Sequence, residues 1–208
     1  MKKKRKLKKK VVILIILIVI LVLLIGGFLL YKFVFTKEED HAKVVSEIPE
    51  YGYTLEEDQP KIYKELFKEL AKVLKEENVD TEKYASIAGQ MLAIDFYNLD
   101  NKVSKNDVGG TEFIKDNYID NFVLEASDTV YKYIEQNLYG KRKQELPIVT
   151  SSSVKDIEKG SYTYANKTDD NAYKVTVNLE YKKDLGYPKE VVVKFLHNGK
   201  RLEAYEMN

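Results

Sequence analysis

The sequence predicts an α+β protein, in which an N-terminal transmembrane helix is followed by a helical layer packed on a C-terminal antiparallel β-meander. Three observations predict it. A long apolar run lies near the N-terminus, amphipathic helical periodicity follows it, and the C-terminal third changes to the two-residue alternation of strands. Helices followed by a run of strands are the order expected of an α+β domain.

Charge divides the 208-residue chain into a cationic head and an anionic body. Residues 1–37 contain ten basic and no acidic residues, whereas the remaining 171 residues contain 24 basic and 33 acidic ones. The net charge of +1 is therefore the sum of +10 and −9. The acidic body argues against nucleic acid, teichoic acid or another anionic polymer as a partner, because like charges repel.

Composition also narrows the chemistry. With no Cys, the chain has no disulfide, thiolate metal site or cysteine nucleophile. The two histidines, His41 and His197, are far apart in sequence and offer little material for a metal site or proton relay. We therefore predict no catalytic residue, no metal and no cofactor, and favour a protein that is not an enzyme.

The apolar run predicts a membrane anchor. From Val11 to Leu30, 18 of 20 residues are Val, Ile, Leu or Phe, and a helix of this length spans about 30 Å, the thickness of a bilayer core. A soluble core seldom surrounds such a helix on every side. No small-residue cleavage site follows it, so we expect an uncleaved signal anchor over 11–35.

The flanks of this span predict its orientation. Eight basic residues lie in the tail, 1–10, which places the N-terminus in the cytoplasm and the domain outside the cell membrane. Residues 36–54 lack periodicity and are interpreted as a juxtamembrane linker, leaving 55–208 as the extracytoplasmic domain.

Two amphipathic helices open the predicted domain. The first covers about Leu55 to Glu77, with Pro60 in its first turns, and the second covers Thr81 to Leu99. Asn101 to Gly110 is dense in turn residues, and Gly109 with Gly110 predicts a turn more readily than a phosphate-binding loop. A further helical stretch is expected from Thr111 to Tyr139, broken near Ser127 and Asp128 and ended by Gly140.

Asp95 is the candidate site residue in these helices, because it falls near the centre of the apolar stripe of the second one. Two interpretations remain open. Asp95 is either a polar group in a ligand pocket, with Tyr84 and Tyr97 as polar neighbours, or a carboxylate that bonds backbone amides of the adjoining loop or faces water.

Strands are predicted in the C-terminal third. Tyr173 to Tyr181 alternates apolar and polar residues, Val191 to His197 follows a turn, and Asn198-Gly199 predicts a hairpin into a closing strand, Lys200 to Met207. Ile148 to Ile157 and Ser161 to Tyr164 indicate one or two more strands, so that three or four consecutive antiparallel strands form a meander.

This architecture resembles a known family. The span Val11 to Leu30, the helical stretch Leu55 to Tyr139 with AIDFYNLDNK (93–102), and the paired strands 171–183 and 187–207 are similar to the membrane-anchored nuclear-transport-factor-like cone fold. This fold occurs in inner-membrane assembly proteins of type IV secretion and Gram-positive conjugation systems. The resemblance implies a scaffold that contacts partners and itself, and the long helical part departs from a minimal cone.

The sequence therefore predicts a single-pass extracytoplasmic domain that acts as a non-catalytic scaffold or interaction module of a bacterial cell envelope. Envelope proteins or a second copy of the chain are its expected partners. Frequent Lys, Ile, Tyr and Asn indicate a bacterium with an AT-rich genome. The alternative is a cone-fold pocket that binds or transforms a small molecule through Asp95, Tyr84 and Tyr97.

Overall fold

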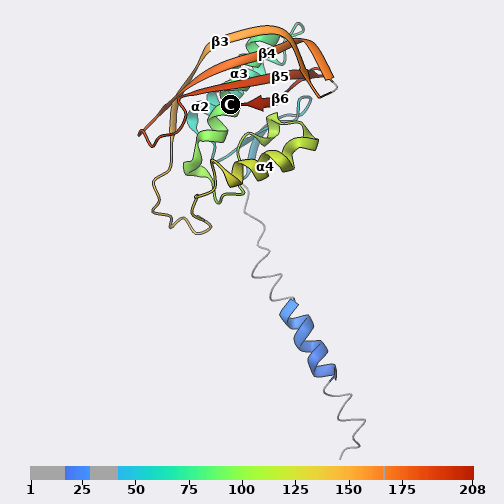
Figure 1. Ribbon diagram of the computed structural model, residues 1–208, viewed down its shortest axis with the longest axis vertical. Coiled ribbons are helices and arrows are strands. Elements are labelled where there is room, and N and C mark those ends of the chain that lie inside the picture. The colour runs from blue at the N-terminus through green and yellow to red at the C-terminus, as the bar shows by residue number, and fades with distance from the viewer. Residues whose placement is uncertain (1–16, 29–41, 166) are drawn as a thin grey trace, which may run out of the picture. The chain divides into compact units, whose positions relative to one another are not determined.

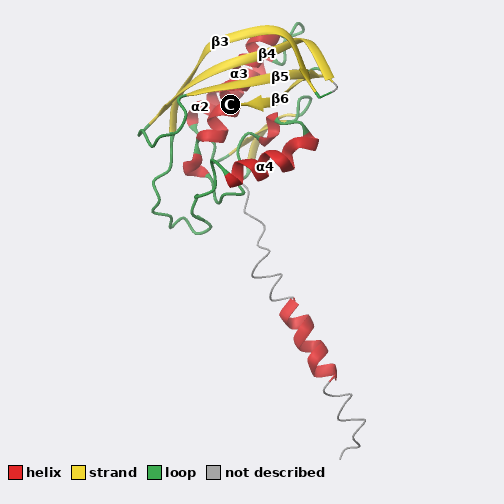
Figure 2. Ribbon diagram, viewed as in Figure 1, coloured by secondary structure: helices red, strands yellow, loops and turns green. Residues whose placement is uncertain are grey.

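The computed structural model describes residues 17–28, 42–165 and 167–208, which belong to two separate compact units, Met1–Asp40 and His41–Asn208. In the first unit, residues 17–28 form an α-helix (Figures 1 and 2). Across the described residues, no helix combines the length and apolar character that crossing a bilayer requires. The basic tail, the ends of the predicted span and residues 36–41 lie outside the described residues.

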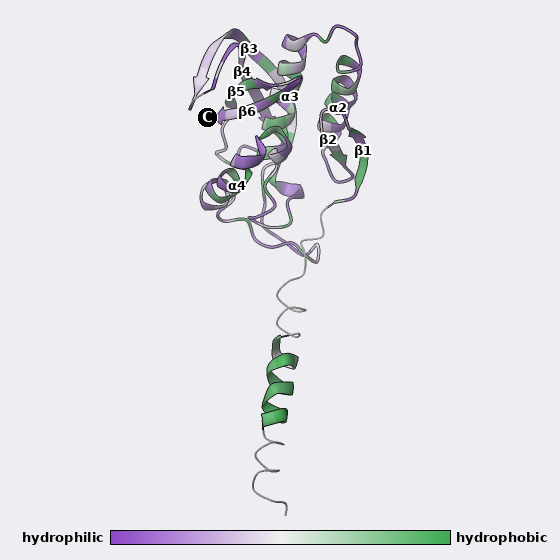
Figure 3. Ribbon diagram, turned by 90° about the vertical axis from the view of Figure 1, so that its right-hand side faces the viewer, coloured by the Kyte–Doolittle hydropathy of each residue, from purple (hydrophilic) through white to green (hydrophobic). Residues whose placement is uncertain are grey.

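The second unit is an α+β domain in which helices pack on a four-stranded antiparallel sheet, as the sequence predicts. Figure 3 shows three layers: the hairpin of β1 (Val44–Ile48) and β2 (Tyr53–Glu56) lies with α2 (Lys61–Val73) on one side, α3 (Thr81–Tyr97) lies in the middle, and the sheet lies on the other side. The sheet order is β3-β4-β5-β6, so each strand pairs with its neighbour in the chain. The strands are β3 (Val149–Tyr164), β4 (Lys167–Tyr181), β5 (Glu190–Asn198) and β6 (Arg201–Met207).

The predicted linker is part of this domain from residue 42 onward. It contains strand β1 (Val44–Ile48), which pairs antiparallel with β2 (Tyr53–Glu56). Tyr53 and Leu55 point into the core, and this burial explains why a charged segment without clear periodicity is ordered. We expected the first helix to begin at Leu55, but Leu55 belongs to β2 of the hairpin. The helix therefore begins later and forms Lys61–Val73 (α2), with Pro60 as its N-cap.

Helix α3 (Thr81–Tyr97) is the centre of the core. The prediction gave it one apolar stripe, but it is buried on nearly all sides, since the sheet covers one side and α2 with the hairpin covers the other. Gly89 lies against Val175 of β4, and a Cβ there would be 3.0 Å from the Val175 side chain. Short 3₁₀ turns follow at Leu99–Asn101 (η1), Thr111–Phe113 (η2) and Asp116–Tyr118 (η3).

The third predicted helix is much shorter than expected. Instead of running from Thr111 to Tyr139, it forms only Ile119–Asp128 (α4). Tertiary contacts override the helical pattern beyond it, because the Tyr131 side chain is fully buried and its hydroxyl donates to the Phe96 carbonyl at 2.6 Å. Residues 129–148 therefore form a long loop without helix or strand.

At the β6 edge of the sheet, two tyrosine hydroxyls bind the backbone of Leu202. The N–H of Leu202 donates to the Tyr84 hydroxyl at 3.0 Å, and its carbonyl accepts from the Tyr53 hydroxyl at 3.2 Å. The two hydroxyls lie 2.5 Å apart. Unpaired strand edges favour association with other strands. At this edge the two tyrosines occupy both backbone groups of Leu202, and Ile114 forms a parallel bridge to Ala204 further along the strand.

Tyr84→Phe is expected to lower the free energy of unfolding by about 1–3 kcal/mol, since it leaves the buried Leu202 N–H without its acceptor. Urea unfolding followed by circular dichroism measures this. Tyr133→Phe, at a side chain that is 77 % exposed, is the matched control and should change the free energy of unfolding little. A loss no larger than that of the control would contradict the role given to Tyr84.

Candidate functional site

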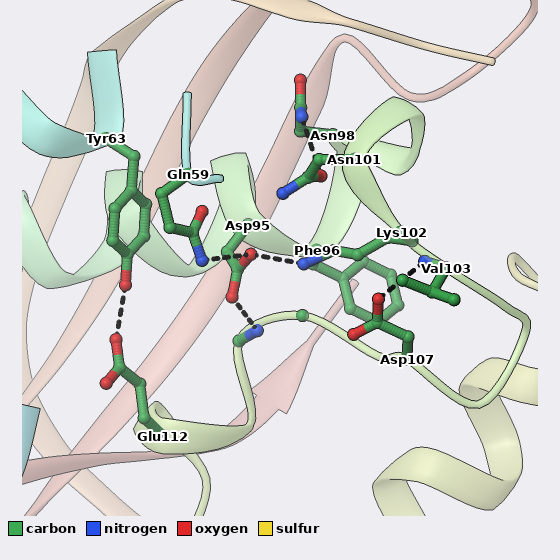
Figure 4. A network of polar contacts seen from close by, with 12 residues as sticks. Gln59, Tyr63, Asp95, Phe96, Asn98, Asn101, Lys102, Val103, Asp107 and Glu112 are labelled. Carbon is green, nitrogen blue, oxygen red and sulfur yellow. Dashed lines mark hydrogen bonds and ion pairs between the residues drawn. The ribbon is translucent and has the colours of Figure 1, made fainter. Parts of the chain in front are cut away.

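A network of buried polar groups surrounds Asp95 near the C-terminal end of α3 (Figure 4). The Asp95 side chain accepts from the Gln59 amide at 3.0 Å, the Lys102 ammonium at 2.7 Å and the Gly110 backbone N–H at 2.6 Å. Asp95 is 7 % exposed and Lys102 4 %. The carboxylate therefore joins the segment before α2, the loop after α3 and the start of η2.

The charge states of this pair are stable. Burial favours the neutral form of Asp95, but the Lys102 ammonium with the Gln59 and Gly110 donors outweighs it and holds the pKa of Asp95 below its usual value. Burial acts against the Lys102 charge, yet the adjacent Asp95 raises its pKa above the usual value. Both groups stay ionised at neutral pH, which suits a structural ion pair better than proton transfer.

The two glycines in the adjoining turn are required by close backbone contact. A Cβ on Gly109 would lie 2.1 Å from the Asp95 carbonyl oxygen, and Gly110 has a φ of +80°. The Tyr131 hydroxyl accepts from the Gly109 N–H at 3.1 Å. The glycine pair forms a turn, as predicted, and the structure shows that this turn brings the loop against α3. The N–H groups of the two glycines are occupied by Tyr131 and Asp95.

Beside this network lies a cleft of about 260 Å³, hereafter the acidic cleft. Carboxylates dominate its charge, with Lys102 as the basic group among its lining residues. Burial and the charge of Asp58 raise the pKa of Glu56. The residues that line the acidic cleft are Thr54, Glu56, Gln59, Asp95, Lys102, Asn106, Asp107, Val108, Gly109, Thr111, Glu112 and Val123.

Glu112 is the group in the acidic cleft whose protonation changes near neutral pH. Its carboxylate accepts from the Thr54 N–H at 2.8 Å and from the Tyr63 hydroxyl. Burial raises the pKa of Glu112 to about 7, although the Thr54 and Tyr63 donors favour its charged form. Glu112 is able to take up or release a proton in this cleft at physiological pH.

A larger cleft of about 580 Å³, hereafter the aromatic cleft, lies among the ends of α3, α4 and β6. Its tyrosines Tyr118, Tyr164 and Tyr205 make edge contacts with ring centroids 5.1 to 5.9 Å apart. The lining residues are Phe96, Tyr97, Ile114, Tyr118, Asn121, Phe122, Glu125, Ala126, Thr129, Val130, Tyr164, Ala204, Tyr205, Glu206, Met207 and Asn208.

The three residues predicted to share a pocket lie in three different places. Asp95 borders the acidic cleft, Tyr97 lines the aromatic cleft, and Tyr84 covers the edge of β6. Along α3, Tyr84 and Asp95 are separated by about 16 Å at 1.5 Å per residue. Asp95 satisfies part of both interpretations, because it bonds the Gly110 amide and also borders a cleft.

Sequence reasoning did not find Gln59, Lys102 and Glu112 as parts of this site. Gln59 and Glu112 come from segments 36 and 17 positions from Asp95 in the chain, with no spacing that links them. Lys102 follows the end of α3 in a segment whose sequence is typical of a polar turn, so nothing in the sequence singles it out. Among the described residues, no group of three or more His, Asp or Glu side chains has an arrangement that could hold a metal ion.

No family model, curated protein or solved structure matches this chain.

Lys102→Met is expected to lower the free energy of unfolding by about 3–5 kcal/mol, because it leaves the Asp95 carboxylate buried without its counter-charge. Adding Asp95→Asn removes that charge and should recover part of the loss. Chemical unfolding of the single and double variants measures the coupling. Lys105→Met, at an exposed lysine of the same loop, is the control, and equal effects of the two lysine variants would refute the structural role of the pair.

Glu112 is expected to make stability depend on pH between its unfolded value of 4.5 and its folded pKa of about 7. Below pH 4.5 both states are protonated and the stabilisation is complete; as pH rises, the unfolded state loses its proton first, so the stabilisation declines. The difference in unfolding free energy between wild type and Glu112→Gln should fall by about 3 kcal/mol over this range. A difference independent of pH would contradict the raised pKa.

Proposed function

We propose that this protein is a single-pass membrane protein whose extracytoplasmic α+β domain acts as a non-catalytic interaction module of a bacterial cell envelope. The apolar run Val11–Leu30, preceded by eight basic residues, carries the proposal. In its described part, the side chains from Leu17 to Ile25 are 48 to 69 % exposed. A helix that exposes so many apolar side chains needs an apolar environment to cover them.

The buried polar groups of the domain bind one another and the chain itself, and this supports an interaction role. Asp95 and Lys102, its most deeply buried ion pair among the described residues, bind each other and neighbouring segments of the chain. Their partners are part of the fold, so their contribution is to position the loop after α3. This supports a domain that presents surfaces for recognition.

The proposal includes a relation to the family that the architecture resembles. Helices that precede an antiparallel meander, with the helices packed on one sheet, support a cone-like arrangement related to the assembly proteins of type IV secretion and conjugation. By analogy the domain contacts envelope proteins or a second copy of itself. A fold does not by itself determine a function, so recovery of a partner protein is the decisive measurement for the proposed relation to these assembly proteins.

Topology is tested with single cysteines, because the native chain has none. Lys4→Cys and Thr163→Cys are expressed separately in a bacterial host and treated with a membrane-impermeant maleimide. Thr163→Cys should react in intact cells, and Lys4→Cys should react after the membrane is permeabilised. Reaction of both sites in intact cells, or release of the chain from membranes by alkaline carbonate, would overturn the proposed anchor.

Partner contact is tested by cross-linking in intact cells of the source bacterium, followed by purification of the chain under denaturing conditions. We expect the same envelope protein, or the dimer of this chain, in repeated experiments. Recovery of the uncross-linked monomer alone would contradict the interaction role.

A second candidate function is ligand binding in the aromatic cleft. Its volume of about 580 Å³ lies within the range of small-molecule sites, and its lining is aromatic with a few polar groups. These features suit a planar, largely apolar ligand. Phe122→Trp would fill the cleft, and it should abolish the binding of a hydrophobic fluorescent dye; unchanged dye binding would remove this cleft as the site.

A further inference from the structure

The loop formed by residues 129–148 exposes large side chains although it is anchored to the core. It has 20 residues without helix or strand, and loops of this length in compact domains are usually functional or disordered. Tyr131, Ile134 and Leu146 are buried and hold it in place. The exposed fractions of Tyr133, Leu138 and Tyr139 are nevertheless 77, 42 and 74 %.

Polar contacts give the loop a defined shape. The Arg142 guanidinium donates to the carbonyl of Lys102 at 2.7 Å and to that of Asp100 at 2.6 Å, which ties the loop to the turn after α3. Gln144 bridges two positions within the loop, accepting from the Glu135 N–H and donating to the Tyr133 carbonyl, both at 2.8 Å. The exposed aromatic side chains are therefore presented by an ordered backbone.

The charge of this loop is opposite to that of the rest of the domain. Residues 129–148 contain four basic and two acidic residues, whereas 42–208 as a whole contain 24 basic and 30 acidic ones. One of the two acidic residues, Glu145, is paired with Lys183 of the chain after β4. The loop is thus a local basic and aromatic surface on an acidic domain, and the acidic average of the body does not describe it.

The 129–148 loop lies at the end of the domain where β1 begins. Figures 1 and 3 show the long connection between α4 and β3 at the same end of the domain as the beginning of β1. Eleven residues separate Leu30 from residue 42, and they can span at most about 40 Å. If the apolar run is in the bilayer, this end of the domain stays within that distance of the lipid headgroups.

We propose that the 129–148 loop is a second membrane contact, which binds anionic phospholipid headgroups through Lys132, Lys141 and Lys143 and inserts Tyr133, Leu138 and Tyr139 at the interface. Tyrosine is enriched at the membrane interface, where its ring is apolar and its hydroxyl is wet. Basic side chains beside it are attracted to the negative surface.

A weak contact suffices for this role, because the anchor supplies the high local concentration of lipid. The inference therefore rests on the proposed anchor. Its consequence is orientation: with the loop at the bilayer, the domain has a preferred face toward the membrane and a preferred face toward partners.

Fluorescence of a single labelled cysteine tests this contact in the full chain. Tyr139→Cys carries an environment-sensitive dye, and Thr163→Cys in the β3–β4 hairpin region is the reference position. Each chain is reconstituted into vesicles of phosphatidylcholine with or without phosphatidylglycerol. We expect a blue shift and a several-fold rise in emission at position 139 with phosphatidylglycerol, and little change at position 163.

Charge variants identify the cause of the shift. Lys141→Glu with Lys143→Glu should reduce the emission rise several-fold, and added salt should weaken it. Lys72→Glu with Lys75→Glu, which makes the same charge change at exposed positions of α2 and just after it, is the matched control and should leave the signal unchanged.

Three results would overturn the inference in distinguishable ways. Equal emission at positions 139 and 163 in chains that float with the vesicles would remove the loop contact and leave the anchor intact. Failure of the chain to float would remove the anchor and the loop contact together. A rise at position 139 produced by soluble polyphosphate in pure phosphatidylcholine vesicles would assign the loop to a polyanion instead of lipid.

Discussion

The buried carboxylate of Asp95 is the interaction on which the arrangement of the domain depends. It lies near the end of the central helix, where an unpaired charge would be expensive, and it collects donors from Gln59, Lys102 and Gly110. These donors come from segments on both sides of α3 in the chain. The hairpin side, the loop after α3 and the entry to η2 must therefore meet at one point, and the close approach requires glycine at position 109.

The same helix end separates the two clefts. Successive residues on a helix point about 100° apart, so Asp95 borders the acidic cleft while Phe96 and Tyr97 line the aromatic one. Glu112 adds a carboxyl group that titrates near neutral pH to the first cleft. The second cleft and the 129–148 loop present aromatic surface. Carboxylates thus gather around the structural network, whereas the aromatic surfaces lie among the ends of α3, α4 and β6 and on the 129–148 loop.

Prediction from sequence succeeded where periodicity reports burial directly. The alternation of Tyr173 to Tyr181 predicted the strand that is now part of β4, and Asn198-Gly199 predicted the hairpin that joins β5 to β6, where Asn198 lies opposite Arg201. It failed where distant contacts decide the backbone. The hairpin at 44–56 and the loop around Tyr131 depend on burial against α3 and on hydrogen bonds to Phe96 and Gly109, which local propensity does not contain. Of the candidate site, Asp95 was found from its place on an apolar stripe, but its partners were not.

The sequence by itself determined that a basic, apolar head is followed by an acidic body, and that helices precede strands in an α+β domain. It also excluded cysteine chemistry, because the chain contains no Cys. These properties are sums or local patterns, and no long-range contact is needed to read them. The tertiary structure alone decided that Asp95 is paired with Lys102, that Tyr84 and Tyr97 lie apart from it, and that a basic aromatic loop stands out on an acidic domain. Such features arise when segments far apart in the chain are brought together, and the energy of burying polar groups then selects their partners.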